Sequence, residues 1–202
     1  MKILVTGFEA FNQEVINPSG EIIKALAETF GENLCILKLP VEFKRAGELL
    51  EEAIMRLQPD ITLSFGQAGK RECITIERVA INVDDAIIPD NIGYQPIDTT
   101  ISGIGPAAYF TTLPLRGLLQ CLSENEIEAK ISNSAGTYVC NHVMYQALHL
   151  AETRFPNMKA GFIHVPYMKE QAEGKENVPY MELTEMIKAA EIIIRYLEKQ
   201  AS

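Results

Sequence analysis

Two spacings of apolar residues alternate along this chain. Short runs of β-branched or continuously apolar residues, typical of buried strands, occupy residues 2–6, 34–39, 61–65, 73–83, 129–134 and 161–165. Apolar positions at helical spacing follow at residues 18–30, 43–57, 115–122, 140–155 and 183–199. Strands that alternate with helices in this way predict an α/β sandwich around a mostly parallel, twisted sheet.

The chain has 202 residues, a length that one domain can accommodate. No internal repeat, low-complexity segment or linker interrupts it, so residues 1–202 are predicted to form a single domain. Between Ile87 and Pro106 the regular pattern gives way to a stretch rich in glycine and proline. Long loops inside compact domains usually serve function, which makes this stretch a candidate for it.

Composition and charge narrow the class of protein. The formal net charge is -9, and no cluster of lysine and arginine balances it, which argues against binding to nucleic acid or to an anionic membrane. No segment approaches the ~20 apolar residues needed to span a bilayer, and the N-terminal run is typical of a strand rather than a signal peptide. The cysteines Cys35, Cys73, Cys121 and Cys140 lie far apart, as expected for reduced thiols. We therefore expect a soluble, cytoplasmic protein.

The stretch from Ile131 to His142, ISNSAGTYVCNH, is the strongest local candidate for chemistry. It predicts a strand, a tight turn and a helix that begins at Cys140. The free N–H groups of a first helical turn favour a thiolate and can hold an oxyanion. Most free cysteines are simply small buried residues, so this stretch alone leaves both interpretations open.

Two further polar residues stand within predicted strands. Glu77 lies in ITIERVAIN, where a buried carboxylate is costly unless it is paired. Its partner is either Arg71 or Arg78 in a structural ion pair, or an imidazole N–H in a catalytic triad. His164 closes the apolar strand in FIHVPY. It is either a core residue bonded to the backbone or part of a site at the strand end.

Several motifs for cofactors and metals are incomplete. The segment GQAGKR at residues 66–71 lacks the spacing and the Ser or Thr of a P-loop, and Gly103 and Gly105 lack the third glycine of a dinucleotide fingerprint. His142 and His149 would lie two helical turns, about 10 Å, apart, which is too far to share a metal ion. We therefore predict no metal and no nucleotide cofactor. A nucleotide-binding α/β protein remains an alternative that binding of ATP or NAD would support.

Taken together, these stretches resemble the pyroglutamyl peptidase I family of cysteine peptidases over nearly the whole chain. GQAGKRECITIERVAIN is similar to the family's glutamate signature, with Glu77 at the active position. ISNSAGTYVCN is similar to its cysteine signature, with Cys140 as nucleophile, and GFIHVPYMKEQ to its histidine segment, with His164 as base. PDNIGYQP, GPAAYFTTLP and NPS also look like the family.

The resemblance implies a cysteine exopeptidase that removes an N-terminal pyroglutamyl (5-oxoproline) residue from peptides through an acyl-enzyme. It implies Cys140, His164 and Glu77 as the catalytic residues, no cofactor and no metal. It also implies a homotetramer. Phe8 and Phe11, which would otherwise pass for core residues, would pack on the lactam ring. The remaining substrate-binding residues that it implies are Asn17, Gln67, Ile88, Tyr138 and Val139.

The sequence departs from the family in three places. Ile87 stands where relatives carry an arginine close to the catalytic centre, so a fixed positive charge is missing. Lys70 stands where a glycine is common and can partly replace that charge. The segment from Gly7 to Asn12, GFEAFN, lacks a proline and a glycine of the usual opening. The change at Ile87 sustains a second hypothesis, a catalytically weak relative that binds pyroglutamyl or other lactam ligands without turnover.

Overall fold

Six strands form the central sheet of the computed structural model, which describes residues 1–200. In spatial order they are β2 (Leu34–Leu39), β1 (Ile3–Phe8), β3 (Ile61–Gln67), β8 (Lys159–Val165), β4 (Ile74–Glu77) and β7 (Ala129–Ser132). Neighbouring strands run parallel except at the β8–β4 pair, which is antiparallel. The predicted mostly parallel sheet is confirmed.

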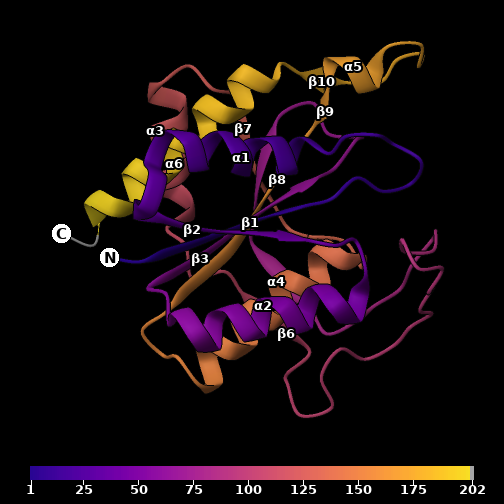
Figure 1. Cartoon of the computed structure of the whole chain (residues 1–202), viewed down its shortest axis with the longest axis vertical. Coiled ribbons are helices and arrows are strands. Elements are labelled where there is room, and N and C mark those ends of the chain that lie inside the picture. Colours follow the sequence, from indigo (N-terminus) through magenta and orange to yellow (C-terminus); the bar gives the residue numbers. More distant parts are fainter. Residues whose placement is uncertain (201–202) are drawn as a thin grey trace.

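Helices cover both faces of this sheet (Figure 1). One face carries α1 (Pro18–Phe30), α3 (Leu115–Glu124) and α6 (Leu183–Gln200), and the other carries α2 (Phe43–Leu57) and α4 (Val139–Thr153). Buried apolar side chains form one cluster under each helical layer. The α/β sandwich expected from the alternating pattern is therefore the observed architecture.

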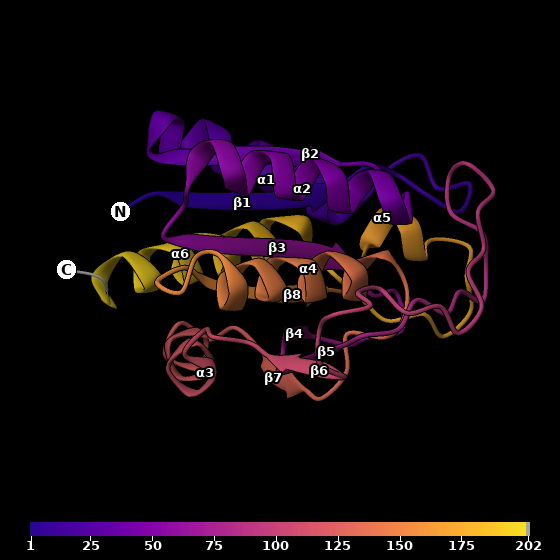
Figure 2. The ribbon, with the colours of Figure 1, turned by 90° about the horizontal axis from the view of Figure 1, so that it is seen from below.

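Smaller elements complete the fold and were not predicted. They are the 3-10 turn η1 (Gly31–Asn33), the ribbon of β5 (Val79–Ile81) and β6 (Ala108–Phe110), the pair β9 (Tyr167–Met168) and β10 (Tyr180–Met181), and the short helix α5 (Lys169–Ala172). The loops that follow β1 and α5, and the long loop between β5 and β6, gather at one end of the molecule, opposite the N-terminus (Figure 2). No helix within residues 1–200 is long and apolar enough to cross a membrane.

The predicted single strand over residues 73–83 is wrong, because the chain leaves the sheet at Arg78. The N–H group of Arg78 still bonds to the carbonyl of Ser132, at 2.8 Å, whereas its own carbonyl accepts from Thr111, at 2.9 Å, beyond the sheet. The following residues then pair with β6 as a separate ribbon. The run of apolar residues continues through the break, so the pattern gives no sign of it.

The turn between β7 and α4 is also longer than predicted. The strand ends at Ser132 and the helix begins at Val139, so residues 133–138 form a loop rather than a tight turn. Gly136 adopts φ +80° in this loop, a conformation that favours glycine. The helix itself and its first-turn cysteine lie where the sequence predicts them.

The stretch from Ile87 to Pro106 is a loop, as predicted, and hydrogen bonds fix its conformation. An isolated antiparallel β-bridge joins Thr99, within the stretch, to Asp84, which precedes it. The carboxylate of Asp90 accepts the N–H groups of Ile92 and Tyr94, at 3.1 and 2.8 Å. These bonds order the loop without regular secondary structure.

Candidate active site

A cavity of about 320 Å³ lies where the ends of β1, β3 and β8 meet the start of α4. Its lining brings together residues from opposite ends of the chain, namely Phe8, Phe11, Asn17, Val41, Gln67, Ala68, Arg71, Ser134, Ala135, Gly136, Tyr138, Val139, Cys140 and His164. All the predicted site residues except Glu77 and Ile88 belong to this lining. Glu77 lies behind His164, and Ile88 is half-buried in the long loop outside the cavity.

Cys140 occupies the first turn of α4 and faces the cavity. The side chain of the N-cap residue, Tyr138, makes no hydrogen bond to this turn. The backbone N–H groups of the first turn of α4 therefore stay available at the cavity wall. On the other side, the thiol packs against Gly66 of β3, where a Cβ atom would lie 2.9 Å from Sγ of Cys140. Gly66 therefore makes room for the thiol beside the sheet.

His164 and Glu77 form a buried pair. Nδ1 of His164 lies 2.7 Å from Oε1 of Glu77, and the two residues are 3% and 0% exposed. Because an ionised carboxylate only accepts, Nδ1 carries the proton and Nε2 is left as an acceptor in the neutral imidazole. Arg78, one alternative partner of Glu77, instead donates from Nε to Oδ1 of Asn133, at 2.8 Å.

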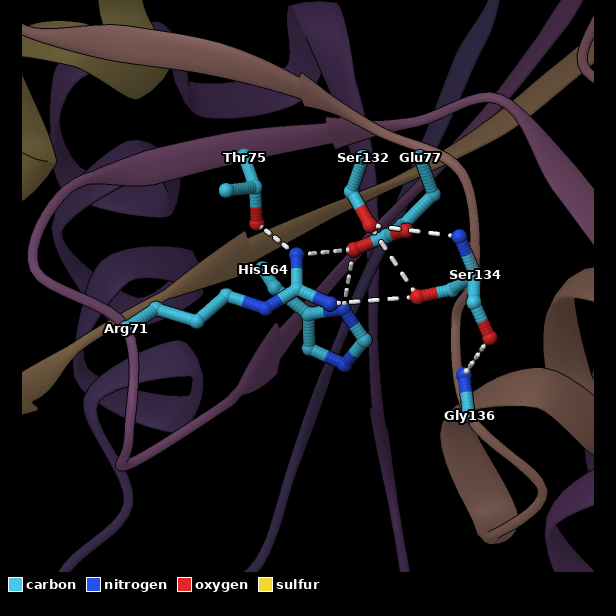
Figure 3. Close-up of polar contacts among 7 residues, drawn as sticks. All are labelled: Arg71, Thr75, Glu77, Ser132, Ser134, Gly136 and His164. Atoms are coloured by element: carbon cyan, nitrogen blue, oxygen red, sulfur yellow. Dashed lines mark hydrogen bonds and ion pairs between the residues drawn. The ribbon is translucent and has the colours of Figure 1, made fainter.

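Arg71, which lines the cavity, contacts the same carboxylate (Figure 3). Its Nη1 lies 2.5 Å from Oε1 of Glu77 and also bonds to Oγ1 of Thr75, and its Nη2 donates to the carbonyl of Ser134, at 3.1 Å. The sequence offered an ion pair or an imidazole as alternative partners of Glu77, and the structure contains both. Arg71 also ties the 133–138 loop to the site, a role that its position in the sequence does not reveal.

Burial and charge set the protonation states of the three groups. Burial, with the nearby Glu77 charge, raises the pKa of Cys140 to about 12, although Arg71 opposes this. Burial also holds the pKa of His164 below its ordinary 6.5, despite the bond to Glu77. For Glu77, burial acts to raise the pKa, but the hydrogen bonds from His164 and Ser132 and the charge of Arg71 outweigh it and lower the pKa. The ligand-free site thus holds a thiol, a neutral imidazole and a carboxylate.

This state differs from the thiolate that the helix start alone leads one to expect. The first-turn N–H groups are present and stabilise a thiolate. Burial destabilises the thiolate by a larger amount, so the thiol form is favoured. Deprotonation of Cys140 therefore requires transfer of its proton to a base within the cavity.

Comparisons with known proteins show which family the chain belongs to. Residues 1–200 match the family model described as pyroglutamyl peptidase. The chain belongs to the pyroglutamyl peptidase family. It is 50% identical over 195 residues to a pyrrolidone-carboxylate peptidase of Streptococcus pneumoniae, covering 96% of this chain and 91% of that protein. It is 48% identical over 200 residues to pyrrolidone-carboxylate peptidase 1 of Caldanaerobacter subterraneus, covering 98% of both.

Solved structures of the family share the fold. The pyroglutamyl peptidase I of Bacillus amyloliquefaciens superimposes with a TM-score of 0.90 at 40% identity, over 95% of this chain and 94% of the other. A variant of the pyrrolidone carboxyl peptidase of Pyrococcus furiosus gives a TM-score of 0.93 at 41% identity over 100% of both chains. The family resemblance drawn from the sequence is thus confirmed.

The two residues that follow Cys140, Asn141 and His142, have structural partners. Asn141 accepts from the N–H group of Ile81, at 2.9 Å, and donates to the carbonyls of Ile81 and Val83, at 2.9 and 3.0 Å. His142 is buried with Nδ1 2.8 Å from Oδ2 of Asp84. Both residues fasten α4 to the segment around β5, which explains why polar residues follow the cysteine.

The two departures from the family that change charge, at Ile87 and Lys70, lie away from the cavity. Ile87 is 95% exposed and does not line the cavity. Lys70 is also exposed and outside the lining, whereas its neighbour Arg71 lies within it. Among the described residues that line the cavity, Arg71 is the only lysine or arginine. The positive charge at this site therefore comes from Arg71 rather than from Lys70.

Proposed function

We propose that this chain is a cysteine exopeptidase that removes an N-terminal pyroglutamyl residue from peptides. The observation that carries the proposal is that Cys140 and His164 line one cavity, while Glu77 forms a hydrogen bond with Nδ1 of His164 on the buried side of the imidazole. A nucleophile, a base and an orienting carboxylate are the parts that acyl transfer needs. The names of the relatives, pyrrolidone-carboxylate peptidases, support the choice of substrate.

In the proposed reaction, Nε2 of His164 takes the proton of the Cys140 thiol as Sγ attacks the pyroglutamyl carbonyl carbon. The first-turn N–H groups of α4 stabilise the oxyanion. The imidazolium then gives its proton to the departing amine, and the C–N bond breaks to leave a thioester. A water molecule, deprotonated by His164, attacks this thioester and releases 5-oxoproline, and the proton returns to the thiol. Glu77 keeps the imidazole in the required tautomer and stabilises its charged form.

The character of the cavity suits a small neutral lactam. Phe8, Phe11, Val41 and Tyr138 supply apolar and aromatic surface, and the amides of Asn17 and Gln67 supply polar atoms. A pyroglutamyl end carries no charged α-amino group, so the net charge of -9 neither attracts nor repels it. The proposed roles of these residues follow from that match of shape and polarity.

Release of a fluorescent amine from a pyroglutamyl amide, under reducing conditions, tests the proposal. The comparison compound is the corresponding prolyl amide, which has the same ring but carries a protonated amine and no lactam carbonyl. We expect turnover of the pyroglutamyl compound and at least about 100-fold lower kcat/KM for the prolyl compound, because buried polar groups are left unpaired. A folded, reduced chain that cleaves neither compound would contradict the peptidase assignment and favour the lactam-binding alternative.

The acid side of the pH profile is a further expectation. His164 acts as a base only when neutral, and its pKa lies below 6.5, so kcat/KM should reach half its plateau below pH 6.5 on the acid side. Arg71 lowers the pKa of His164 through its charge, so Arg71→Gln should move this half-point to higher pH. Initial rates in buffers of constant ionic strength give both profiles. An acid half-point above neutrality in the unmodified protein would contradict the assignment.

Introduction of the family arginine should have a small effect. The side chain at position 87 points into solvent, where a charge is screened by water and salt. We therefore expect Ile87→Arg to change kcat/KM by about threefold or less. Steady-state kinetics at low and at high salt would check this, with Ile87→Gln as the uncharged control. A large, salt-sensitive gain confined to the arginine variant would reveal coupling to the site.

We also propose that copies of the chain assemble into a homotetramer through the loop of residues 88–106. Ile92, Ile97 and Ile104 in this loop are between 71% and 90% exposed, and apolar surface of this kind is typical of association sites. Light scattering should give four times the mass of one chain, and Ile97→Glu should lower that mass while the far-ultraviolet circular dichroism stays the same. The mass of a single chain at micromolar concentration would exclude the assembly.

A further inference from the structure

Gln171 is a buried side chain just behind the cavity wall. It lies in α5, is 4% exposed and does not itself line the cavity. Its Oε1 accepts the N–H group of Met168, at 3.1 Å. Its Nε2 donates to the carbonyl of Ile16, at 3.3 Å, and to Oε1 of Gln67, at 2.9 Å. One amide thus joins three segments that border the site.

These partners allow Gln171 only one orientation. A backbone N–H group can only donate and a backbone carbonyl can only accept. Reversal of the amide would set its oxygen against the carbonyl of Ile16 and its NH₂ group against the N–H of Met168. Gln171 must therefore present a donor to Gln67. Gln67 in turn must receive that donor with its oxygen, so its own NH₂ group is left for other partners.

Within the described residues, the NH₂ group of Gln67 is unpaired at the cavity wall. Gln67 belongs to the cavity lining, and no partner for its Nε2 occurs among residues 1–200. Asn17, the other amide in the lining, is arranged in the same way. Its Oδ1 accepts from N and Oγ of Ser19, at 3.1 and 2.8 Å, and its Nδ2 donates to the carbonyl of Glu9, at 2.9 Å. Both amide oxygens therefore accept from donors within the protein, and each amide keeps an N–H for a ligand.

We propose that Gln171 is a positioning residue for substrate recognition, because it fixes the amide of Gln67 with its N–H groups toward the cavity. This inference rests on the proposed function. A donor at this place selects an acceptor on the ligand, and the acceptor that distinguishes a pyroglutamyl ring from a prolyl ring is the lactam carbonyl. Gln171 therefore determines specificity for a ring carbonyl without touching the substrate.

Gln171→Glu tests the orientation because a carboxylate can accept but not donate at neutral pH. Gln67 then turns its NH₂ group toward the new carboxylate and its oxygen toward the lactam oxygen. We expect KM for the pyroglutamyl amide and Kd for 2-pyrrolidone to rise about tenfold or more, with a much smaller change in kcat. Gln171→Met is the matched control. Methionine has no amide to orient the side chain of Gln67, so both KM and Kd should rise by only about threefold.

A readout that does not involve the lactam separates this role from a general loss of structure. The rate of alkylation of Cys140 by iodoacetamide depends on the thiol and His164, and should match the unmodified protein in both variants. Equal losses in the glutamate and methionine variants, or a larger loss in the methionine variant, would overturn the proposal and indicate that Gln171 only supports the fold.

A double-mutant cycle with Gln67 completes the test. In a Gln67→Met background no amide remains to be turned, so Gln171→Glu should add little to Kd for 2-pyrrolidone. A further rise of the same size as in the unmodified background would overturn the proposal. Calorimetry of 2-pyrrolidone also keeps the two hypotheses apart. Absent turnover with intact lactam binding defeats the peptidase assignment alone, whereas absent lactam binding by the unmodified protein defeats the role of Gln171.

Discussion

Replacement of Cys140 by serine is expected to lower kcat/KM for a pyroglutamyl amide by about 10³-fold or more. A hydroxyl is a far weaker acid than a thiol, and burial already raises the pKa of the thiol here to about 12. The pKa of His164 is held below its ordinary value, so this imidazole is too weak a base to compensate. The attack step would lose its nucleophile while the cavity keeps its shape.

Two comparisons make that loss specific to the nucleophile. Cys140→Ser should still bind 2-pyrrolidone with a Kd close to that of the unmodified protein, because the ring contacts lie elsewhere in the cavity. Cys121→Ser is the matched substitution, since Cys121 lies on α3 and donates to the carbonyl of Leu118, at 3.3 Å, a bond that a hydroxyl can also make. Steady-state rates of both variants would decide the matter. Retention of a tenth of the activity by Cys140→Ser would mean that another group attacks the substrate.

Much of the fold could be predicted because periodicity reports which face of an element is buried. The α1 helix shows how local this information is. Asn17 caps it by accepting the N–H group of Ser19, and Pro18 occupies its first turn, both of which the sequence signals directly. The departure of the chain from the sheet at Arg78 depends instead on the partners of Ser132 and Thr111. Such partners lie too far along the chain for a local pattern to identify them.

The candidate site divides in the same way. Signatures around Cys140, His164 and Glu77 point to the three residues, yet they do not tell whether the thiol is ionised. That depends on burial from several segments at once, which outweighs the helix start. Arg71 and Gln171 gain their roles only through contacts with Glu77 and Gln67. The local sequence around Arg71 and Gln171 does not indicate these contacts, so it could not predict their roles.

Glu77→Gln should cost nearly as much activity as loss of the nucleophile, with kcat/KM falling by about 10² to 10⁴-fold. Oε1 of Glu77 now accepts from both Nδ1 of His164 and Nη1 of Arg71. An amide has one weaker acceptor for the two donors and can offer its NH₂ group to the imidazole, which selects the wrong tautomer. The imidazolium formed during attack also loses its countercharge. The variant tests both functions of the carboxylate, orientation and charge.

Stability must be measured beside activity, because Glu77 also neutralises Arg71. Loss of the carboxylate leaves a partly buried guanidinium without its charged partner, which should lower the free energy of unfolding by about 1–3 kcal/mol. Glu72→Gln is the control, since Glu72 is an exposed carboxylate in the same segment. Thermal denaturation and kinetics well below the midpoint separate the two losses. If Glu77→Gln is destabilised but keeps near-normal kcat/KM, the carboxylate serves Arg71 alone, and His164 needs no third group to act as a base.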